Sequence, residues 1–106
     1  MNPRPGFDLH PGAAQDIPEI WEFIAEDSPH AAQRMREEML EAIGKLVAFP
    51  HEGHKRDDLT KRPLRFWRVR DFLVAYVRDA KPLPVLAVLH DRRNPRTISA
   101  ILNKRQ

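Results

Sequence analysis

Arginine is the commonest side chain in the second half of the chain that could take part in chemistry. Among the arginines on or beside segments expected to be strands are Arg62, Arg65, Arg68, Arg70, Arg92 and Arg93. Guanidinium groups bind carboxylates and phosphates through paired hydrogen bonds, so this density indicates a surface that meets an anionic partner. Nucleic acid and an acidic protein segment both fit that description.

His90 and Tyr76 are the side chains that could add proton transfer to these cations. His90 stands next to Arg92 and Arg93, whose charge favours the neutral imidazole that a general base requires. The structural alternative is a histidine that closes the sheet and hydrogen-bonds to the backbone. Tyr76, the only tyrosine, has apolar neighbours in an expected strand, which is also the pattern of a core ring with its hydroxyl at the edge.

A metal site is a further possibility that the spacing suggests. His51-x-x-His54 could supply two ligands, and Glu52, Asp57 and Asp58 lie nearby. The segment lacks the helical H-E-x-x-H pattern and has the composition of a polar loop, so we expect no metal and no other cofactor. The chain contains no cysteine, which excludes disulfides, thiolate catalysis and Cys-bound zinc.

Length and composition limit the class of protein. The 106 residues are enough for one compact domain, residues 1–106, with 42% hydrophobic and 31% charged residues. No apolar run approaches the roughly 18 residues of a membrane-spanning helix. Residues 1–6 show no secretory signal. We therefore expect a small soluble protein of the cytoplasm that does not associate with membranes.

Charge is divided unevenly along the chain. Residues 1–50 hold four basic and nine acidic side chains, whereas residues 51–106 hold fourteen basic and six acidic ones. This division predicts one basic face that meets an anionic partner. An acidic helical pair packed beside a basic sheet would give the same counts.

The first half of the chain predicts a short strand followed by a helix. Phe7–His10 alternates apolar and polar residues, as strands do. The apolar residues after it recur at helical spacing, and two start points fit this pattern. The helix begins at Asp16, which Glu19 would complete as a capping box, or it begins near Gly12 and contains Pro18.

A helical hairpin should follow from this start. With either start point, Trp21 and Ile24 would face the core. Ser28-Pro29 combines an N-cap with a first-turn proline, so a second helix is expected from about Pro29 to Phe49. The two helices are joined by one tight turn and should pack against each other.

The second half predicts a loop and then a sheet. Residues 50–63 are polar and rich in turn formers. Apolar, β-branched and aromatic residues dominate the next three segments: Leu64–Arg70, Phe72–Arg78 and Val85–Leu89. These segments are expected to form a three-stranded antiparallel meander, which gives an α+β fold with the helices packed on a single sheet.

A short final helix is expected from Asn94, an N-cap followed by proline, to about Arg105. Three apolar residues share one face, and they either pack on the sheet or await a partner: Ile98, Ile101 and Leu102. Three basic residues should be exposed, and target contacts are expected on this helix: Arg96, Lys104 and Arg105.

Alternation along the first strand of the meander predicts where its charges lie. Arg68 and Arg70 should share one face of the sheet, and Arg65 should share the other with Trp67. Arg65 would then be half-buried with a partner, or it would line a groove. Phe66 and Trp67 should pack against the helices, although rings beside arginines can also stack on nucleic-acid bases.

Several segments of the chain, taken in their order and spacing, carry a resemblance to a known family. Leu64-Arg65-Phe66-Trp67-Arg68-Val69 is followed by Phe72-Leu73-Val74-Ala75-Tyr76 and then by Val85-Leu86-Ala87-Val88-Leu89-His90-Asp91-Arg92-Arg93-Asn94. Together with the two amphipathic segments 14–24 and 28–32, they resemble the RelE/ParE superfamily of toxins from type II toxin–antitoxin systems. The resemblance extends from Phe7 to about Leu102, and the arginine-bearing end of the last strand is closer to the ParE branch.

The resemblance implies the superfamily's α+β fold: an N-terminal strand, a two-helix hairpin, a three-stranded antiparallel meander that completes one sheet, and a short C-terminal helix. It also implies a growth-inhibiting toxin that is silenced in a hetero-oligomer by a ParD-like antitoxin encoded beside it. ParE-like members poison DNA gyrase and are associated with plasmid stabilisation, whereas RelE-like members cleave mRNA in the ribosome.

Cleavage of RNA through its own 2′-hydroxyl needs a base, an acid and cations around the phosphate. RelE-like members often place a tyrosine or histidine in the C-terminal segment, and residues 97–106 contain neither. The candidates for such a site are His90, Arg65, Arg92, Arg93 and Tyr76. Because these residues do not form a recognisable catalytic constellation in the sequence, we expect no enzymatic activity.

We therefore expect a ParE-like toxin that acts by binding DNA gyrase. The alternative is a RelE-like, ribosome-dependent mRNA endonuclease, and a third possibility is a degenerate member that binds only its antitoxin. The cations expected to contact the target or the antitoxin are Arg62, Arg65, Arg68, Arg70, Arg92, Arg93, Arg96 and Lys104.

Overall fold

The computed structural model describes residues 6–106. Its elements in chain order are β1 (Phe7–Leu9), α1 (Pro11–Ala25), α2 (Pro29–Ala48), a 3-10 turn η1 (Pro50–Glu52), β2 (Arg65–Val69), β3 (Phe72–Tyr76), β4 (Leu83–His90) and α3 (Pro95–Lys104). Every helix and strand expected from the sequence is present, in the expected order. Residues 1–5, which belong to the segment examined for a secretory signal, lie outside the described residues.

The four strands form one sheet in the order β1-β4-β3-β2. β2, β3 and β4 pair antiparallel, which confirms the predicted meander, and β1 pairs parallel with β4. β1 pairs only with Leu83 to Val85, so the remainder of β4 has no neighbouring strand on that side. A β-bulge opposite Tyr76 shifts the register and leaves Leu86 as the extra residue of β4.

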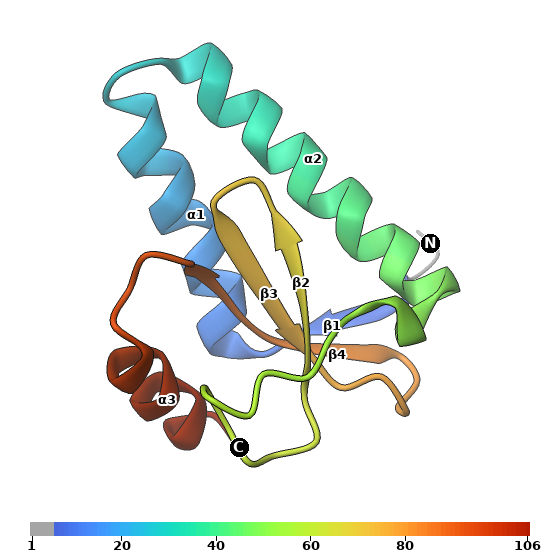
Figure 1. The fold of residues 1–106 in the computed structure, drawn as a ribbon. Helices are drawn as coiled ribbons and strands as arrows, with labels where there is room; N and C mark the ends of the chain where they lie inside the picture. Colours follow the sequence, from blue (N-terminus) through green and yellow to red (C-terminus); the bar gives the residue numbers. More distant parts are fainter. Residues whose placement is uncertain (1–5) are drawn as a thin grey trace.

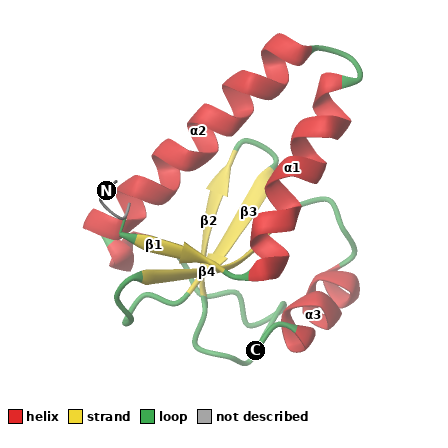
Figure 2. Ribbon diagram, turned by 180° about the vertical axis from the view of Figure 1, so that it is seen from behind, coloured by secondary structure: helices red, strands yellow, loops and turns green. Residues whose placement is uncertain are grey.

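Helices cover both faces of this sheet. The α1–α2 hairpin lies on one face and α3 on the other (Figure 1), and the view from behind shows the same layers (Figure 2). The buried side chains accordingly form two clusters, one between the hairpin and the sheet and one between α3, the loop before β2 and the sheet. All five residues of β3 are buried, because both of its faces are covered.

Helix α1 begins at Pro11, close to the earlier of the two predicted start points. The His10 Nδ1 atom accepts a hydrogen bond of 2.9 Å from the Gly12 N–H and so caps the first turn. The alternative start at Asp16, with its capping box, is therefore wrong, because Asp16 lies in the second turn of α1. Pro18 lies inside the helix.

Ile24 packs against the core as predicted, but Trp21 does not. Trp21 is half-buried and lines a shallow groove between α1 and α2, beside Arg36. Ile17, Ile20 and Ile24 already occupy the stripe of α1 that faces the sheet, so the indole lies at the edge of that stripe.

The predicted caps of the other two helices are confirmed. The Ser28 Oγ atom accepts a hydrogen bond of 3.1 Å from the Ala31 N–H, and the Asn94 Oδ1 atom accepts one of 2.8 Å from the Arg96 N–H. Ile98 and Leu102 are buried against the sheet, so the apolar face of α3 packs within the protein. Among residues 6–106, no helix has the length and apolar character needed to cross a membrane.

The prediction that Arg68 and Arg70 share one face is wrong. Arg70 follows β2 in the turn to β3, where its φ of 54° places it in the left-handed region and ends the alternation of the strand. Its guanidinium reaches Glu38 on α2, whereas that of Arg68 reaches Asp91 after β4. Arg65 and Trp67 do lie on the hairpin side, and Phe66 lies on the α3 side.

Tyr76 connects the sheet to the loop that follows α2. Its ring is fully buried, and its hydroxyl accepts a hydrogen bond of 2.9 Å from the Gly53 N–H and donates one of 2.7 Å to the Pro50 carbonyl. A Cβ atom at Gly53 would collide with that hydroxyl, so the close approach requires glycine. The interpretation of Tyr76 as a core ring is confirmed.

Replacement of Tyr76 by phenylalanine tests this connection. The Tyr76→Phe variant leaves the Gly53 N–H and the Pro50 carbonyl without partners, so its free energy of unfolding should fall by about 1–3 kcal/mol. Urea denaturation followed by tryptophan fluorescence measures this change. An unchanged midpoint would show that water replaces the hydroxyl and that the contact adds no stability.

Candidate functional site

A group of basic residues without ion pairs within residues 6–106 lies where β4 ends. Arg92, Arg93 and Arg96 are exposed, and none of them forms an ion pair with any residue in 6–106. Lys104, at the other end of α3, is exposed and equally without an ion pair in the described range. These four predicted site cations are free to receive an anion.

Other predicted site cations already have partners in the fold. Arg68 binds Asp91 at 2.6 Å, and two parallel hydrogen bonds of 2.8 and 2.9 Å join Arg70 to Glu38. The hydrogen bonds from Arg70 hold the pKa of Glu38 below its ordinary value. These pairs leave less charge available for an external partner.

Arg62 and Arg65 differ in whether the guanidinium has a partner within the fold. Arg62 donates from Nη1 to the carbonyls of Leu102 and Arg105 at 2.7 and 2.6 Å, which satisfies the end of α3. Arg65 is half-buried, pairs across the sheet with Tyr76 and has no ion pair within residues 6–106. Only Arg65 of these two keeps a free guanidinium.

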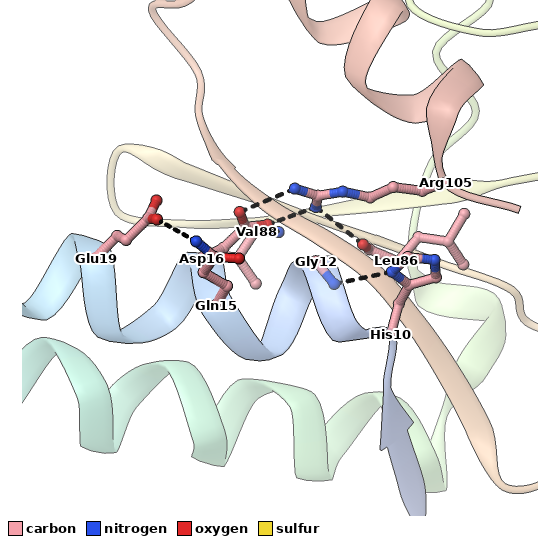
Figure 3. Close-up of polar contacts among 8 residues, drawn as sticks. All are labelled: His10, Gly12, Gln15, Asp16, Glu19, Leu86, Val88 and Arg105. Carbon is pink, nitrogen blue, oxygen red and sulfur yellow. Dashed lines mark hydrogen bonds and ion pairs between the residues drawn. The ribbon is translucent and has the colours of Figure 1, made fainter.

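The most extensive polar contact joins Asp16 of α1 to Arg105 after α3 (Figure 3). Arg105 donates to both carboxylate oxygens, at 2.6 and 3.1 Å, and to the Leu86 carbonyl at 3.0 Å. Asp16 also accepts a hydrogen bond of 3.0 Å from the Val88 N–H. The two side chains are only 12% and 17% exposed, so the expectation of an exposed Arg105 is wrong.

Gly12 makes room for this ion pair. A Cβ atom at residue 12 would collide with the guanidinium of Arg105. A side chain at residue 12 would therefore require the guanidinium of Arg105 to shift from its position beside Asp16. The ion pair connects α1, near the start of the described chain, to Arg105, near its end, and Gly12 leaves the space that this contact needs.

His90 is held against the sheet by local contacts. Its Nδ1 atom accepts a hydrogen bond of 3.1 Å from the Arg92 N–H, and its ring packs edge-on against Phe72 at 5.2 Å. Asp91 lies 3.5 Å from the same nitrogen. This arrangement matches the predicted structural role, in which the histidine closes the sheet and bonds to the backbone.

The five candidate residues for RNA cleavage do not come together. His90 pairs with Phe72 at one end of β3, whereas Arg65 pairs with Tyr76 at the other end. These ends are four residue steps apart along β3, a distance of about 13 Å at roughly 3.3 Å per residue. Burial raises the pKa of Tyr76, so its phenol keeps its proton at neutral pH.

The two loop histidines have separate partners. His51 lies 3.1 Å from an Arg78 nitrogen, and the His54 ring stacks on Trp67. No group of three or more potential metal ligands occurs within residues 6–106.

A cavity of ≈ 280 Å³ opens beside the unpartnered part of β4. Ile20 and Phe23 of α1, Phe72 of β3 and Val88 of β4 supply its apolar lining, and Arg93 lies at its margin. Phe23 is 71% exposed, the largest exposed fraction of any bulky apolar residue in the described chain.

The sequence pattern did not reveal Asp16, Arg105 or Phe23 as parts of one surface. Asp16 and Arg105 are 89 residues apart, and nothing in local periodicity connects them. Phe23 could have been found, because it lies off the three-and-four stripe of α1 and is too apolar for a solvated face.

A family model and a solved structure are similar to this chain. A family model described as "ParE toxin of type II toxin-antitoxin system, parDE" matches residues 7–95. The fold is similar to that of a solved structure described as "Chromosomal ParDE TA system from P. aeruginosa", with a TM-score of 0.64 and 17% sequence identity. That match covers 79% of this chain and 92% of the other. No curated protein sequence is significantly similar to this chain.

Replacement of Asp16 tests the ion pair. The Asp16→Asn variant preserves side-chain volume but leaves the enclosed guanidinium of Arg105 without its counter-charge, so the free energy of unfolding should fall by about 2–3 kcal/mol. The control is Glu38→Gln, which removes the charge of an exposed ion pair and should have a much smaller effect. Equal losses in chemical denaturation would contradict the assigned role of Asp16.

The burial of Tyr76 has a consequence for titration. The only tyrosine should ionise above the ordinary value of 10.0, because burial penalises the phenolate. Folding then favours the protonated phenol of Tyr76, so the free energy of unfolding should fall as the pH rises above 10.0. Ultraviolet absorbance of the folded protein measures this titration, and an apparent pKa at or below 10.0 would contradict it.

Proposed function

This chain belongs to the ParE toxin family of type II toxin–antitoxin systems, and from this membership we propose that it inhibits growth by binding DNA gyrase. Its proposed partner is a ParD-like antitoxin, which forms a hetero-oligomer with it and neutralises it. The similarity to the fold of a chromosomal ParDE system supports this pairing. Neither step requires the toxin to break a covalent bond.

The observation that favours binding over catalysis is the separation of the possible catalytic residues. His90 is fixed at one end of the sheet by the Arg92 N–H and Phe72, and Tyr76 is enclosed at the other end. A base and an acid must both reach the reacting atoms in one pose. Two groups whose positions along the sheet are about 13 Å apart, on a sheet with covered faces, do not meet that requirement.

The proposed gyrase contacts lie on the exposed side of α3 and in the segment before it. Arg96 and Lys104 are exposed there, while Ile98 and Leu102 fix the other side of α3 to the sheet. Truncation of the chain before α3 would also take away the partners of Arg62 and Asp16. Charge reversals on its surface therefore test target binding more cleanly than a truncation does.

Induced expression in a bacterium without the antitoxin tests the proposed target. Pulse labelling of DNA and protein synthesis should show that DNA synthesis stops first and that the DNA-damage response rises. Early arrest of protein synthesis with cleaved transcripts would support an mRNA endonuclease and overturn the proposal. Unimpaired growth would leave only a degenerate member that binds its antitoxin.

Two variants distinguish the contribution of the α3 surface to toxicity from that of His90, the candidate base. The double variant Arg96→Glu, Lys104→Glu should reduce toxicity at least about tenfold, because it reverses two exposed charges without entering the core. His90→Ala should stay toxic, since a binding toxin needs no base. Plating efficiency after induction measures both, and circular dichroism confirms their folding. Loss of toxicity in His90→Ala alone would contradict the proposal.

A further inference from the structure

The last part of the chain, residues 92–106, carries charge of one sign only. It holds five basic residues and no acidic one. Arg105 is bound to Asp16, and the other four have no ion pair within residues 6–106: Arg92, Arg93, Arg96 and Lys104. Asp91, directly before this segment, is bound to Arg68 at 2.6 Å. The segment therefore presents positive charge that no ion pair among the described residues neutralises.

The side of α3 that is turned away from the sheet is basic and polar. Ile98 and Leu102 are buried, whereas the other side of the helix exposes Arg96, Thr97, Ala100, Asn103 and Lys104. Positions 96, 100 and 104 are four residues apart and so lie in one row along the helix. Together with Arg92 and Arg93 in the turn before the helix, these five residues form what we call the basic face of α3.

The spacing of the cations suits a row of phosphates. Arg96 and Lys104 are eight residues apart, which separates their Cα atoms by about 12 Å along the helix at roughly 1.5 Å per residue. Arg93 precedes Arg96 by three residues, so at most about 11 Å of chain lies between their Cα atoms. Each strand of duplex DNA carries one phosphate per roughly 3.4 Å of its axis. The basic face is therefore long enough to meet several successive phosphates at once.

The basic face lacks the side chains with which proteins bind other anionic partners. Residues 91–106 contain no aromatic residue, whereas proteins that hold single-stranded nucleic acid stack its bases on aromatic rings. A protein partner is anchored by large apolar or aromatic side chains, and the exposed apolar residues of α3 are only Pro95 and Ala100. Ile101 packs against the core. The backbone of a DNA duplex needs neither kind of anchor, because its binding is mainly electrostatic.

We propose that the basic face of α3 binds the phosphate backbone of double-stranded DNA without reading its sequence. Its four free cations supply the charge, and Thr97 and Asn103 donate hydrogen bonds to phosphate oxygens, as such side chains do in protein–DNA complexes. The place where this DNA is met rests on the proposed function, because it is the duplex that gyrase holds. The target contacts of α3 are then shared between gyrase and its DNA.

Binding of the full-length toxin to a short, fluorescently labelled DNA duplex, followed by anisotropy, tests this face without gyrase. Four phosphate contacts predict that the logarithm of the binding constant falls against the logarithm of the salt concentration with a slope of about −3.6. Affinity should therefore fall roughly 150-fold between about 50 and 200 mM salt. The double variant Arg96→Ala, Lys104→Ala should bind at least about tenfold more weakly, and its slope should be shallower by about two.

The matched control is the double variant Arg34→Ala, Arg36→Ala. It removes the same net charge from two exposed residues of α2, which have no ion pairs within residues 6–106 and lie on the other face of the sheet (Figure 1). This variant should bind the duplex within about twofold of the unmodified toxin, because charges more than a Debye length from the DNA are screened. Circular dichroism confirms that both double variants are folded.

Equal losses of duplex binding in the two double variants would overturn the basic face, because net charge alone would then explain the attraction. Tighter binding of single-stranded DNA, of RNA or of poly-glutamate than of the duplex would also overturn it. A toxin that inhibits gyrase but binds no duplex would overturn this inference alone. A toxin that binds the duplex as predicted but does not inhibit gyrase would support the basic face and overturn the proposed target.

Discussion

The ion pair between Asp16 and Arg105 is the contact on which the arrangement of the site depends. It connects α1, the middle of β4 and the segment after α3 at one point, and it is enclosed by all three. An ion pair removed from water is favourable only when its remaining donors and acceptors are also satisfied. Here the Leu86 carbonyl and the Val88 N–H complete that requirement.

A sheet covered on both faces explains where the charges can lie. β3 has no exposed residue, and most of β4 is buried as well, so an arginine within either strand would lack water and a counter-charge. Within the sheet, the arginines are therefore confined to the outer strand β2 and to the strand ends. Those of β2 and its turn find acidic partners in the fold, except Arg65. Free cations remain after β4, next to a stretch of that strand which β1 does not cover.

The elements could be predicted because their signals are local. Ser28-Pro29 and Asn94-Pro95 mark helix starts by side-chain chemistry within three residues, and apolar runs mark the strands. The site could not be predicted to the same degree, because its contacts join residues far apart in the chain. Arg105 was expected in water and is enclosed by Asp16, and Arg70 leaves its strand's alternation through a left-handed turn residue. The number of arginines predicted a surface that binds anions, but only the fold shows which arginines have no ion pair within the described residues.

The most direct test of the central claim is a supercoiling assay with purified DNA gyrase and the purified toxin. A binding toxin should inhibit supercoiling at a toxin-to-gyrase ratio near one, His90→Ala should inhibit equally, and added antitoxin should restore activity. Full gyrase activity at a large excess of folded toxin, together with cleavage of mRNA on ribosomes, would contradict the account.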